Sequence, residues 1–464
     1  MTTLLRAALA VVSFSLLAPL AAQKQKFEPI TEERLLAAYA DARAACEKVL
    51  AAKLEELPPL ELVGVDEIAT VVTAENLQLV KLRQPDEEKA VAEAEQLGKS
   101  LAAMIYAKYA WSTRTFLVVP KTWESNARVL NRPKLTSDHA LRAVMVHELC
   151  HALDDRKFDF GKRLLAATTA DAATAFNAVI EGHAQLMARR VCKASGWADG
   201  FDAFTDAIGA VPATHVGGEM AKLLTRVTAA AMAMAYIDGE RFAAAVLSAR
   251  PETGSKDMFE SPPKDAETIL QPQWYLDPTT RPALFYDAEP ALDAFVAKFD
   301  AAVWSSSRNG ITGKQLASGM TMLPQKDVDA VVASLRAARF VRLAPTAAPE
   351  SKVALLVVME FDSEDAARRW VRLSGVVSDH KDETMDKGIL RIIDGKTTPI
   401  ERPPLHGLLQ EKKMKNGRLA FEMATIDAHQ GRLVVETIYS GEPPAAEEHL
   451  KVVEEMFAAI VRRK

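Results

Sequence analysis

Apolar residues recur at helical spacing over most of the first 250 positions. A spacing of three or four residues predicts amphipathic helices, whereas short β-branched, alternating runs predict strands. We expect strands at 61–73 and Thr115–Val119, and an irregular stretch from Pro251 to about Pro290. The expected helices are Thr31 to about Leu57, Asp86–Lys108, Asp138–Asp154 and Asp171–Lys193, followed by Ala- and Met-rich helical segments to about Arg250.

The C-terminal third has a different pattern. Strands are predicted at Val353–Phe361, Gly388–Ile393, Arg418–Ile426 and Arg432–Tyr439, with helices at Asp365–Leu373 and Ala445–Val461. Strands mixed with flanking helices are typical of a small α+β domain. The sequence therefore predicts an α+β protein with a mainly helical domain carrying a small edge sheet at 23–300, and a smaller α+β domain at 320–464.

The first 22 residues have the features of a signal peptide. A short positive start, Met1–Arg6, precedes an apolar run that ends in small residues at Ala22. This run is too short for a comfortable membrane span, so we expect cleavage near Ala22 and export to the periplasm or the extracellular space. An uncleaved anchor is the alternative. After signal removal we expect no membrane span.

Composition restricts the classes of partner. A chain of 464 residues is long enough for two domains, and a net charge of −5 without a basic stripe argues against nucleic acid. The three cysteines, Cys46, Cys150 and Cys192, are too few for a disulfide framework. One bridge of undetermined pairing is compatible with them, but buried free thiols are preferred.

The strongest chemical signal is His147-Glu148-Leu149-Cys150-His151, an HExxH motif in a predicted helix. Residues four apart share a helix face, so both imidazoles can reach one ion. Glu148 is rotated by about 100° from His147 and lies beside that ion. This arrangement suits Zn²⁺ with Glu148 as a general base.

A zinc site that keeps an open position needs a third protein ligand. Other zinc peptidase patterns have a Gly three residues after the second His and a His or Asp three residues further on. This sequence has Asp154 and Lys157 at those positions, so neither pattern applies. A later helix offers Glu181 in an apolar surrounding, where a carboxylate is costly to bury without a partner. Glu181 is the predicted third ligand. His183 lies nearly opposite on the helix, so we expect it either to contact the metal ligands without binding the ion or to lie at the surface.

The chain resembles the gluzincin branch of zincin metallopeptidases, and more narrowly the exported bacterial and archaeal proteins with a HELxHALxDQxF…EGxA pattern. The matching residues are His147–Asp155, Phe158, Glu181–Ala184, the trio Tyr236, Gly239 and Phe242, and the string Pro262–Tyr275. The resemblance implies a zincin-like fold, the ligands His147, His151 and Glu181, and Glu148 as base. It also implies a peptide or protein substrate, with Zn²⁺ as the cofactor.

Two positions depart from that pattern. His183 stands where relatives often have Asp, and Gln271 replaces an expected His, so Tyr275 or Gln271 would have to stabilise the oxyanion. A packed aromatic is an equally good interpretation of Tyr275. We expect substrate to align along the strand Thr115–Val119. The alternative function is a catalytically weak or inactive zincin-fold scaffold. His380, His406, His429 and His449 are expected at the surface.

Overall fold

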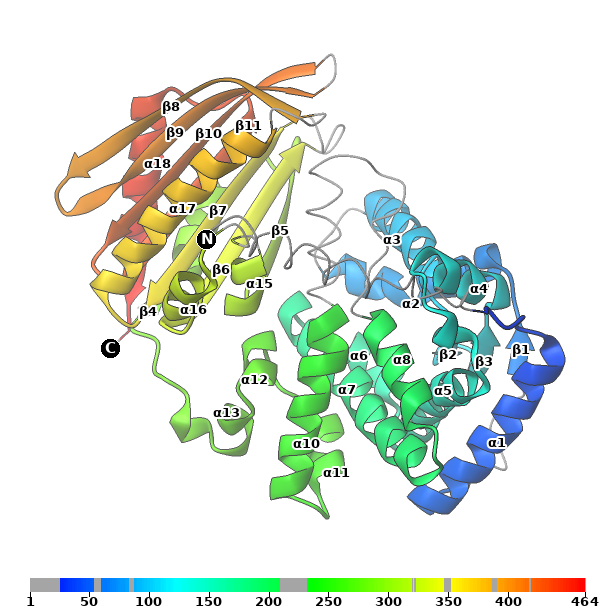
Figure 1. The fold of residues 1–464 in the computed structure, drawn as a ribbon. Coiled ribbons are helices and arrows are strands. Elements are labelled where there is room, and N and C mark those ends of the chain that lie inside the picture. Colours follow the sequence, from blue (N-terminus) through cyan, green and yellow to red (C-terminus); the bar gives the residue numbers. More distant parts are fainter. Residues whose placement is uncertain are drawn as a thin grey trace, which may run out of the picture.

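The computed structural model describes residues 26–53, 60–82, 87–208, 232–318, 320, 323–345, 352–385, 390–416 and 419–463. These residues form an α+β protein with a helical domain and a C-terminal sheet domain, which lie side by side (Figure 1). The predicted signal peptide, 1–22, lies outside the described residues. Among the described helices, none combines the length and apolar character needed to cross a membrane.

The helical domain contains most of the helices and one small sheet. Its three strands are ordered β1-β3-β2, with β1 parallel and β2 antiparallel to the central β3. The strands are β1 (Leu60–Leu62), β2 (Ala107–Ala110) and β3 (Thr115–Val118). The helices are α1 (Glu32–Leu50), α2 (Val65–Lys81), α3 (Glu87–Ala102), α4 (Pro120–Val129), α5 (Asp138–Phe158), α6 (Phe160–Leu165), α7 (Ala170–Ala194), α8 (Ala198–Ile208), the π-helix η2 (Met234–Asp238), α10 (Gly239–Ala249), α11 (Gly254–Glu260), α12 (Ala266–Leu270) and α13 (Pro272–Leu276), with short 3-10 turns η1 (Pro133–Thr136) and η3 (Pro278–Thr280).

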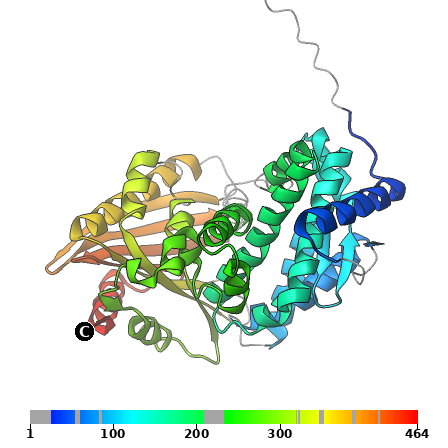
Figure 2. The same cartoon turned by 90° about the horizontal axis from the view of Figure 1, so that it is seen from below.

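Helices α5 and α7 form the centre of this domain. Ser137 caps α5 by accepting a hydrogen bond from the Ala140 amide, and every residue from Ala143 to Ala152 is buried. One apolar core packs α5 against α1, at the edge of the molecule farthest from the sheet domain (Figure 2), and against α8. A second core lies between α7, α10 and α11. A helix buried all round in this way can place polar side chains out of bulk water.

The expected strand at 61–73 is wrong over most of its length. Only Leu60–Leu62 pairs as β1, and α2 begins at Val65. The Glu67 carboxylate accepts a hydrogen bond from the Gly64 amide at 2.5 Å, which fixes the first turn of a helix. Ile68, Ala69 and Val72 then face the core at helical spacing, so tertiary packing overrides the β-branched composition.

The strand along which substrate was expected to align, Thr115–Val119, forms β3 and does not lie at an edge of its sheet. β3 lies between β1 and β2, so the two edge strands are β1 and β2, and part of β2 was expected in a helix ending at Lys108. The Val119 amide donates to the Tyr106 carbonyl, and antiparallel alternation then turns the Tyr109 amide away from β3. The backbone groups of Ala107 and Tyr109 therefore face away from β3, and the Tyr109 amide donates to Glu148.

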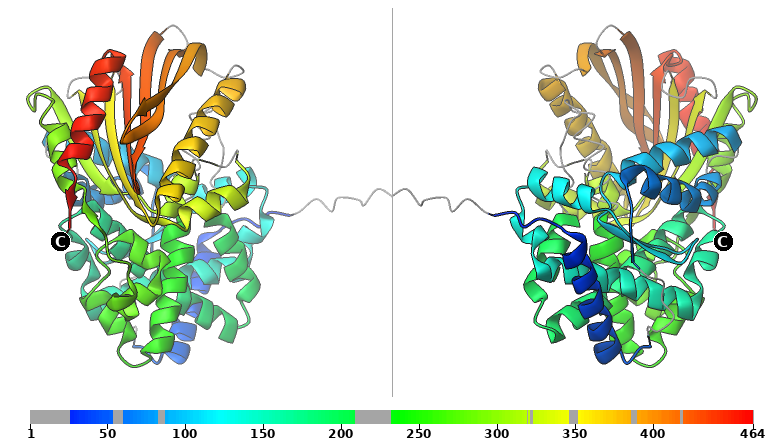
Figure 3. Two further views of the ribbon diagram at one scale, coloured as in Figure 1. Left: turned by 90° about the vertical axis from the view of Figure 1, so that its left-hand side faces the viewer. Right: turned by 90° about the vertical axis from the view of Figure 1, so that its right-hand side faces the viewer.

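The sheet domain is built on one seven-stranded antiparallel sheet, ordered β5-β6-β7-β11-β10-β9-β8. Helix α17 covers one face, while α18 and α14 cover the other (Figure 3). The strands are β5 (Trp304–Gly310), β6 (Leu335–Pro345), β7 (Val353–Phe361), β8 (Leu390–Arg402), β9 (Leu405–Asn416), β10 (Leu419–Gln430) and β11 (Leu433–Gly441); the helices are α14 (Glu289–Val296), α15 (Gly313–Ser318), α16 (Gln325–Val332), α17 (Glu364–Met385) and α18 (Ala446–Ala459). A two-stranded ribbon pairs β4 (Tyr286–Asp287) with β12 (Val461–Arg462).

Three details of the sheet domain differ from expectation. Strands β5, β6 and β9 were not predicted, and α14 with β5 places the start of this domain before residue 320. His429 and His449 are buried, not at the surface. His380 lies in α17, where its side chain is outside the described part.

All three cysteines are buried and none forms a disulfide, as preferred from the sequence.

Candidate metal centre

The HExxH residues lie in the buried middle of α5. His147 and His151 are one turn apart on the same face, and both rings are nearly inaccessible to solvent. Their Nε2 atoms are 3.0 Å apart, so the two rings point toward one common position. The predicted pairing of the two imidazoles is therefore present in the structure.

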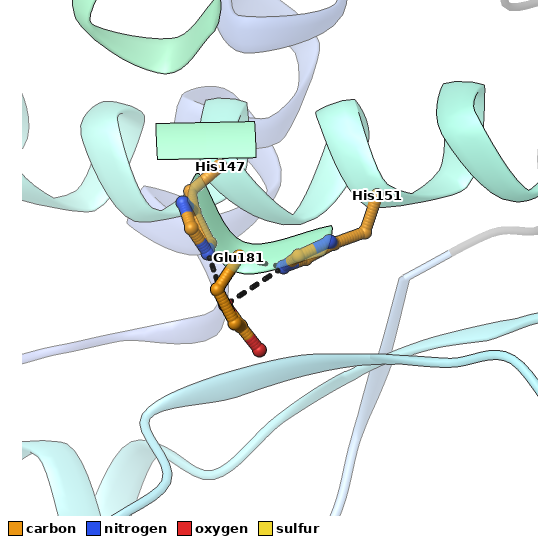
Figure 4. Close-up of side chains that lie close together, drawn as sticks. All are labelled: His147, His151 and Glu181. Atoms are coloured by element: carbon orange, nitrogen blue, oxygen red, sulfur yellow. Dashed lines mark hydrogen bonds and ion pairs between the residues drawn. The ribbon is translucent and has the colours of Figure 1, made fainter. Parts of the chain in front are cut away.

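Glu181 completes this group from α7. Its Oε2 atom lies 3.3 Å from His147 Nε2 and 3.2 Å from His151 Nε2 (Figure 4). Its side chain is about one-fifth exposed, whereas both histidines are buried. Within the described residues, His147, His151 and Glu181 form the one group of three or more His, Cys, Asp or Glu side chains whose ligand atoms come this close.

The spacing of these atoms fits a bound metal ion. Three ligand atoms that each lie 2.0–2.2 Å from a tetrahedral ion are separated by about 3.3–3.6 Å. The three observed separations are 3.0, 3.2 and 3.3 Å, so the side chains already have nearly the geometry of a coordination shell. The group could hold a metal ion with little rearrangement.

Electrostatics in the metal-free group support the same conclusion. Burial disfavours the charged form of Glu181, yet His151 and His147 outweigh burial and hold its pKa well below the usual range. Burial also disfavours a charge on His151, but Glu181, followed by Glu148 and Asp154, raises its pKa. A negative charge on Glu181 is thus stabilised between the two imidazoles, where a bound cation could accept a lone pair from each of the three side chains.

Aromatic packing orients the histidine rings. His147 stacks on Tyr236 at 5.6 Å between centroids and meets the ring of Phe204 edge-on at 5.5 Å. His151 faces Phe160 at 6.1 Å. The Nδ1 atoms of both histidines are buried without a hydrogen-bond partner in the described part of the chain. Ring contacts, rather than hydrogen bonds to Nδ1, therefore direct each Nε2.

Glu148 lies beside the metal group and is largely buried. Its Oε2 accepts a hydrogen bond of 2.6 Å from the Tyr109 amide, on the side of β2 that faces away from β3. Lys108, the preceding residue of β2, is paired with Glu75 at 2.8 Å. Burial disfavours the charge of Lys108, but Glu75 and then Glu148 and Glu181 raise its pKa. A carboxylate held at this place can take up a proton next to a bound ion.

Tyr236 is the functional residue whose role the sequence did not reveal. It lies in the π-helix η2, and its hydroxyl donates a hydrogen bond to Glu181. Burial, with Glu181 and Glu148 nearby, raises its pKa well above the usual value, so the phenol remains a neutral donor. Isolated π-turns within helices are frequent at functional sites, because they redirect a side chain.

A close crossing of two helices brings Tyr236 to the metal group. A Cβ atom added at Gly182 would come within 2.0 Å of the Gly239 backbone, and one at Gly239 would come within 2.2 Å of the Ala178 carbonyl oxygen. Only glycine permits this approach of α7 to the start of α10. The signal was present in the sequence, since Tyr236 and Gly239 belong to the same matched trio, but no spacing rule connects them to Glu181.

Tyr275, predicted as catalytic, is placed elsewhere. Its hydroxyl donates to the Ser261 carbonyl at 3.0 Å and its ring packs edge-on against Phe242, in the second core. Gln271 accepts a hydrogen bond from the Gln273 side chain. These contacts correspond to the packed-aromatic interpretation, and Tyr236 takes the position at the metal group.

His183 is buried and fully engaged, which excludes a surface position. Its Nδ1 lies 2.7 Å from Asp154 and its Nε2 lies 3.0 Å from the Ser255 hydroxyl. Asp154 follows His151 by three residues, so this pair ties α7 to the metal-binding helix from outside the group. His183 supports the position of α5 without offering a ligand atom.

An apolar cavity of about 120 Å³ adjoins Glu148 and Tyr236. Apart from these two residues its walls are mainly aliphatic and aromatic, and it lies between β2, α5 and α8. The lining includes Leu101, Ile105, Val144, Phe204 and Ala207. A cavity of about 150 Å³ with similar walls binds benzene, so this space has the size of one aliphatic side chain.

Comparison with known proteins assigns no family to the chain. No protein-family model matches it, and no curated protein matches it in sequence. The geometry of His147, His151, Glu181, Glu148 and Tyr236 is therefore the basis for assigning a function.

Proposed function

We propose that this protein is an exported, zinc-dependent peptidase. Its active site lies in the helical domain, where it hydrolyses peptide bonds of a substrate. The observation that carries the proposal is the convergence of His147 Nε2, His151 Nε2 and Glu181 Oε2 at mutual distances of 3.0–3.3 Å. Two imidazoles and one carboxylate are a common zinc ligand set in hydrolases.

The residues around the group have the roles that hydrolysis requires. When bound, zinc supplies Lewis acidity and lowers the pKa of a water molecule toward about 7. Glu148 is placed to accept a proton from an attacking water molecule and to deliver it to the leaving amine. Tyr236 donates its hydroxyl proton in a hydrogen bond to the oxyanion that develops on the scissile carbonyl. The neutral state of the phenol suits this role.

Two imidazoles with one carboxylate also bind Fe(II) in oxygenases. The neighbours of the group favour hydrolysis instead, because a general base and a neutral donor stand beside it. Glu148 and Glu181 both lie near Tyr236, since both raise the pKa of its phenol. Zincin-like identity rests on this same arrangement together with the HExxH helix.

The surroundings favour a peptide as substrate. The backbone of Ala107 and the Tyr109 carbonyl, on the side of β2 that faces away from β3, can pair with an extended chain, as peptide-binding sheet edges do. The cavity beside Glu148 can then take one apolar side chain of that peptide, of the size of Leu, Ile or Met. We expect cleavage next to residues of this kind.

Metal analysis and peptide cleavage test this proposal together. The purified full chain is expected to contain about one equivalent of zinc and to cleave casein and aliphatic-rich peptides. Glu148→Gln should retain the zinc and lose cleavage. Zinc retained with no cleavage by either form would favour a scaffold protein, and iron in place of zinc with no cleavage would favour an oxygenase.

A further inference from the structure

The sheet domain reaches the helical domain close to the metal group. Lys314 of α15 extends its Nζ to Asp238 at 2.5 Å. The Asp238 side chain is 6% exposed, and Arg241, its other cation, lies farther away at 3.5 Å. A buried carboxylate needs a close partner, and here the closer one belongs to the other domain.

Asp238 is the last residue of the π-helix η2 and follows Tyr236 by two positions. A π-turn is a rare backbone form that occurs as a single turn within an α-helix. The ion pair with Lys314 fixes the end of this turn, while the Gly182–Gly239 crossing fixes the next residue. Both contacts limit how the turn can place the Tyr236 ring over His147.

A second contact acts on the helix that carries Glu181. Arg339 of β6 lies 3.3 Å from Asp171 in the first turn of α7, and Asp171 also accepts the Ala266 amide at 3.0 Å. Gly310 of β5 allows the close approach, since a Cβ atom there would meet Asp171 at 2.6 Å. The sheet domain therefore contacts both segments that deliver Tyr236 and Glu181.

We propose that the sheet domain positions the metal group, with Lys314 as the positioning residue that holds Asp238 and thereby Tyr236. The inference rests on the proposed hydrolase function for its kinetic consequence only. Lys314 itself touches no metal ligand. Lys314 acts through the π-turn that carries Tyr236. Its loss should therefore weaken stabilisation of the transition state more than it weakens substrate binding.

The test uses the full chain and the variant Lys314→Met, which removes the charge and keeps the length of the side chain. We expect kcat for peptide cleavage to fall about tenfold with KM within twofold of wild type. Lys314→Arg should restore most of kcat. The matched control is Arg308→Met, because Arg308 pairs with Asp293 inside the sheet domain at 2.7 Å; this variant should leave kcat unchanged.

A readout without metal or substrate separates this inference from the proposed function. Hydrogen exchange of the amides in 234–238 should accelerate at least tenfold in metal-free Lys314→Met and remain unchanged in Arg308→Met. Faster exchange in a chain that cleaves no peptide would overturn the hydrolase and retain the positioning role. Wild-type exchange and wild-type kcat in Lys314→Met would overturn the positioning role.

Discussion

At the scale of single residues, two tyrosines share a chemistry but differ in position. Tyr236 stacks on His147 and hydrogen-bonds Glu181, whereas Tyr275 donates to a backbone carbonyl in the second core. The pattern of the sequence pointed to Tyr275, since it stands in the matched Pro262–Tyr275 string. The fold places Tyr236, which lies in a π-turn, over His147, so we propose the donor role for Tyr236 and not for Tyr275.

Tyr236→Phe should therefore lower kcat by roughly 100- to 1000-fold, the usual cost of losing one oxyanion donor. Zinc content should remain close to that of wild type, because the variant keeps all three ligands and the ring stacked on His147. Tyr275→Phe is the matched control and should retain wild-type kcat. Steady-state kinetics on one aliphatic-rich peptide decide the matter. Equal losses in both variants would mean that neither phenol acts on the reaction directly.

At the scale of elements, the crossing of α7 with α10 decides whether the site assembles. Gly182→Ala would place a Cβ atom 2.0 Å from the Gly239 backbone, which cannot move as a flexible side chain can. We expect the free energy of unfolding to fall by about 1–3 kcal/mol, the usual cost of overpacking. Zinc affinity should weaken as well, because Glu181 is the adjacent residue.

The control for this crossing is Gly395→Ala in β8, where the nearest atom to a new Cβ lies 3.8 Å away. Urea unfolding and zinc titration of both variants provide the measurement. Wild-type stability and zinc affinity in Gly182→Ala would show that the two helices are not in the described contact.

A buried histidine in the sheet domain gives a prediction on pH. Burial lowers the pKa of His449 from 6.5 to about 4, and its Nε2 lies 2.7 Å from the Thr437 hydroxyl. The folded state thus prefers the neutral ring, so the stabilisation is complete above about pH 6.5 and is lost as the pH falls toward 4. Protonation of His449 in the unfolded state should therefore lower the free energy of unfolding by about 2 kcal/mol between pH 7 and pH 5. In His449→Gln, the free energy of unfolding measured with urea should fall by that much less between pH 7 and pH 5. If wild type and variant lose the same free energy over this range, His449 does not have the low pKa assigned to it.

The elements also show how far sequence patterns reach. The α5 helix and its two histidines follow from a motif whose spacing fixes the geometry by itself, and Glu181 follows from the cost of an unpaired buried carboxylate. Strand β3 was expected to bind the substrate backbone but lies in the centre of its sheet, because strand order depends on long-range pairing. The strand at 61–73 became α2 because Glu67 caps its first turn and packing outweighs β-branching. Strands β5, β6 and β9 lack the uninterrupted apolar run that made β7 recognisable.

At the scale of the whole molecule, metal binding should couple to folding. The three ligands come from α5 and α7, which meet at the centre of the helical domain and adopt this arrangement only in the folded chain. A ligand that binds only the folded state stabilises it in proportion to its affinity. At free zinc about 1,000-fold above its dissociation constant, the gain is about 4 kcal/mol.

Removal of zinc by a chelator should therefore lower the unfolding temperature of the full chain, and added zinc should restore it. Glu181→Ala should abolish most of this zinc-dependent shift, because it removes one of three ligands and leaves the imidazole pair alone. His449→Gln alters the sheet domain and should keep the whole shift. Thermal unfolding of the three proteins with zinc and with chelator provides the comparison. An undiminished shift in Glu181→Ala would place the stabilising ion somewhere other than between His147 and His151, and the proposed centre would then lose its principal support.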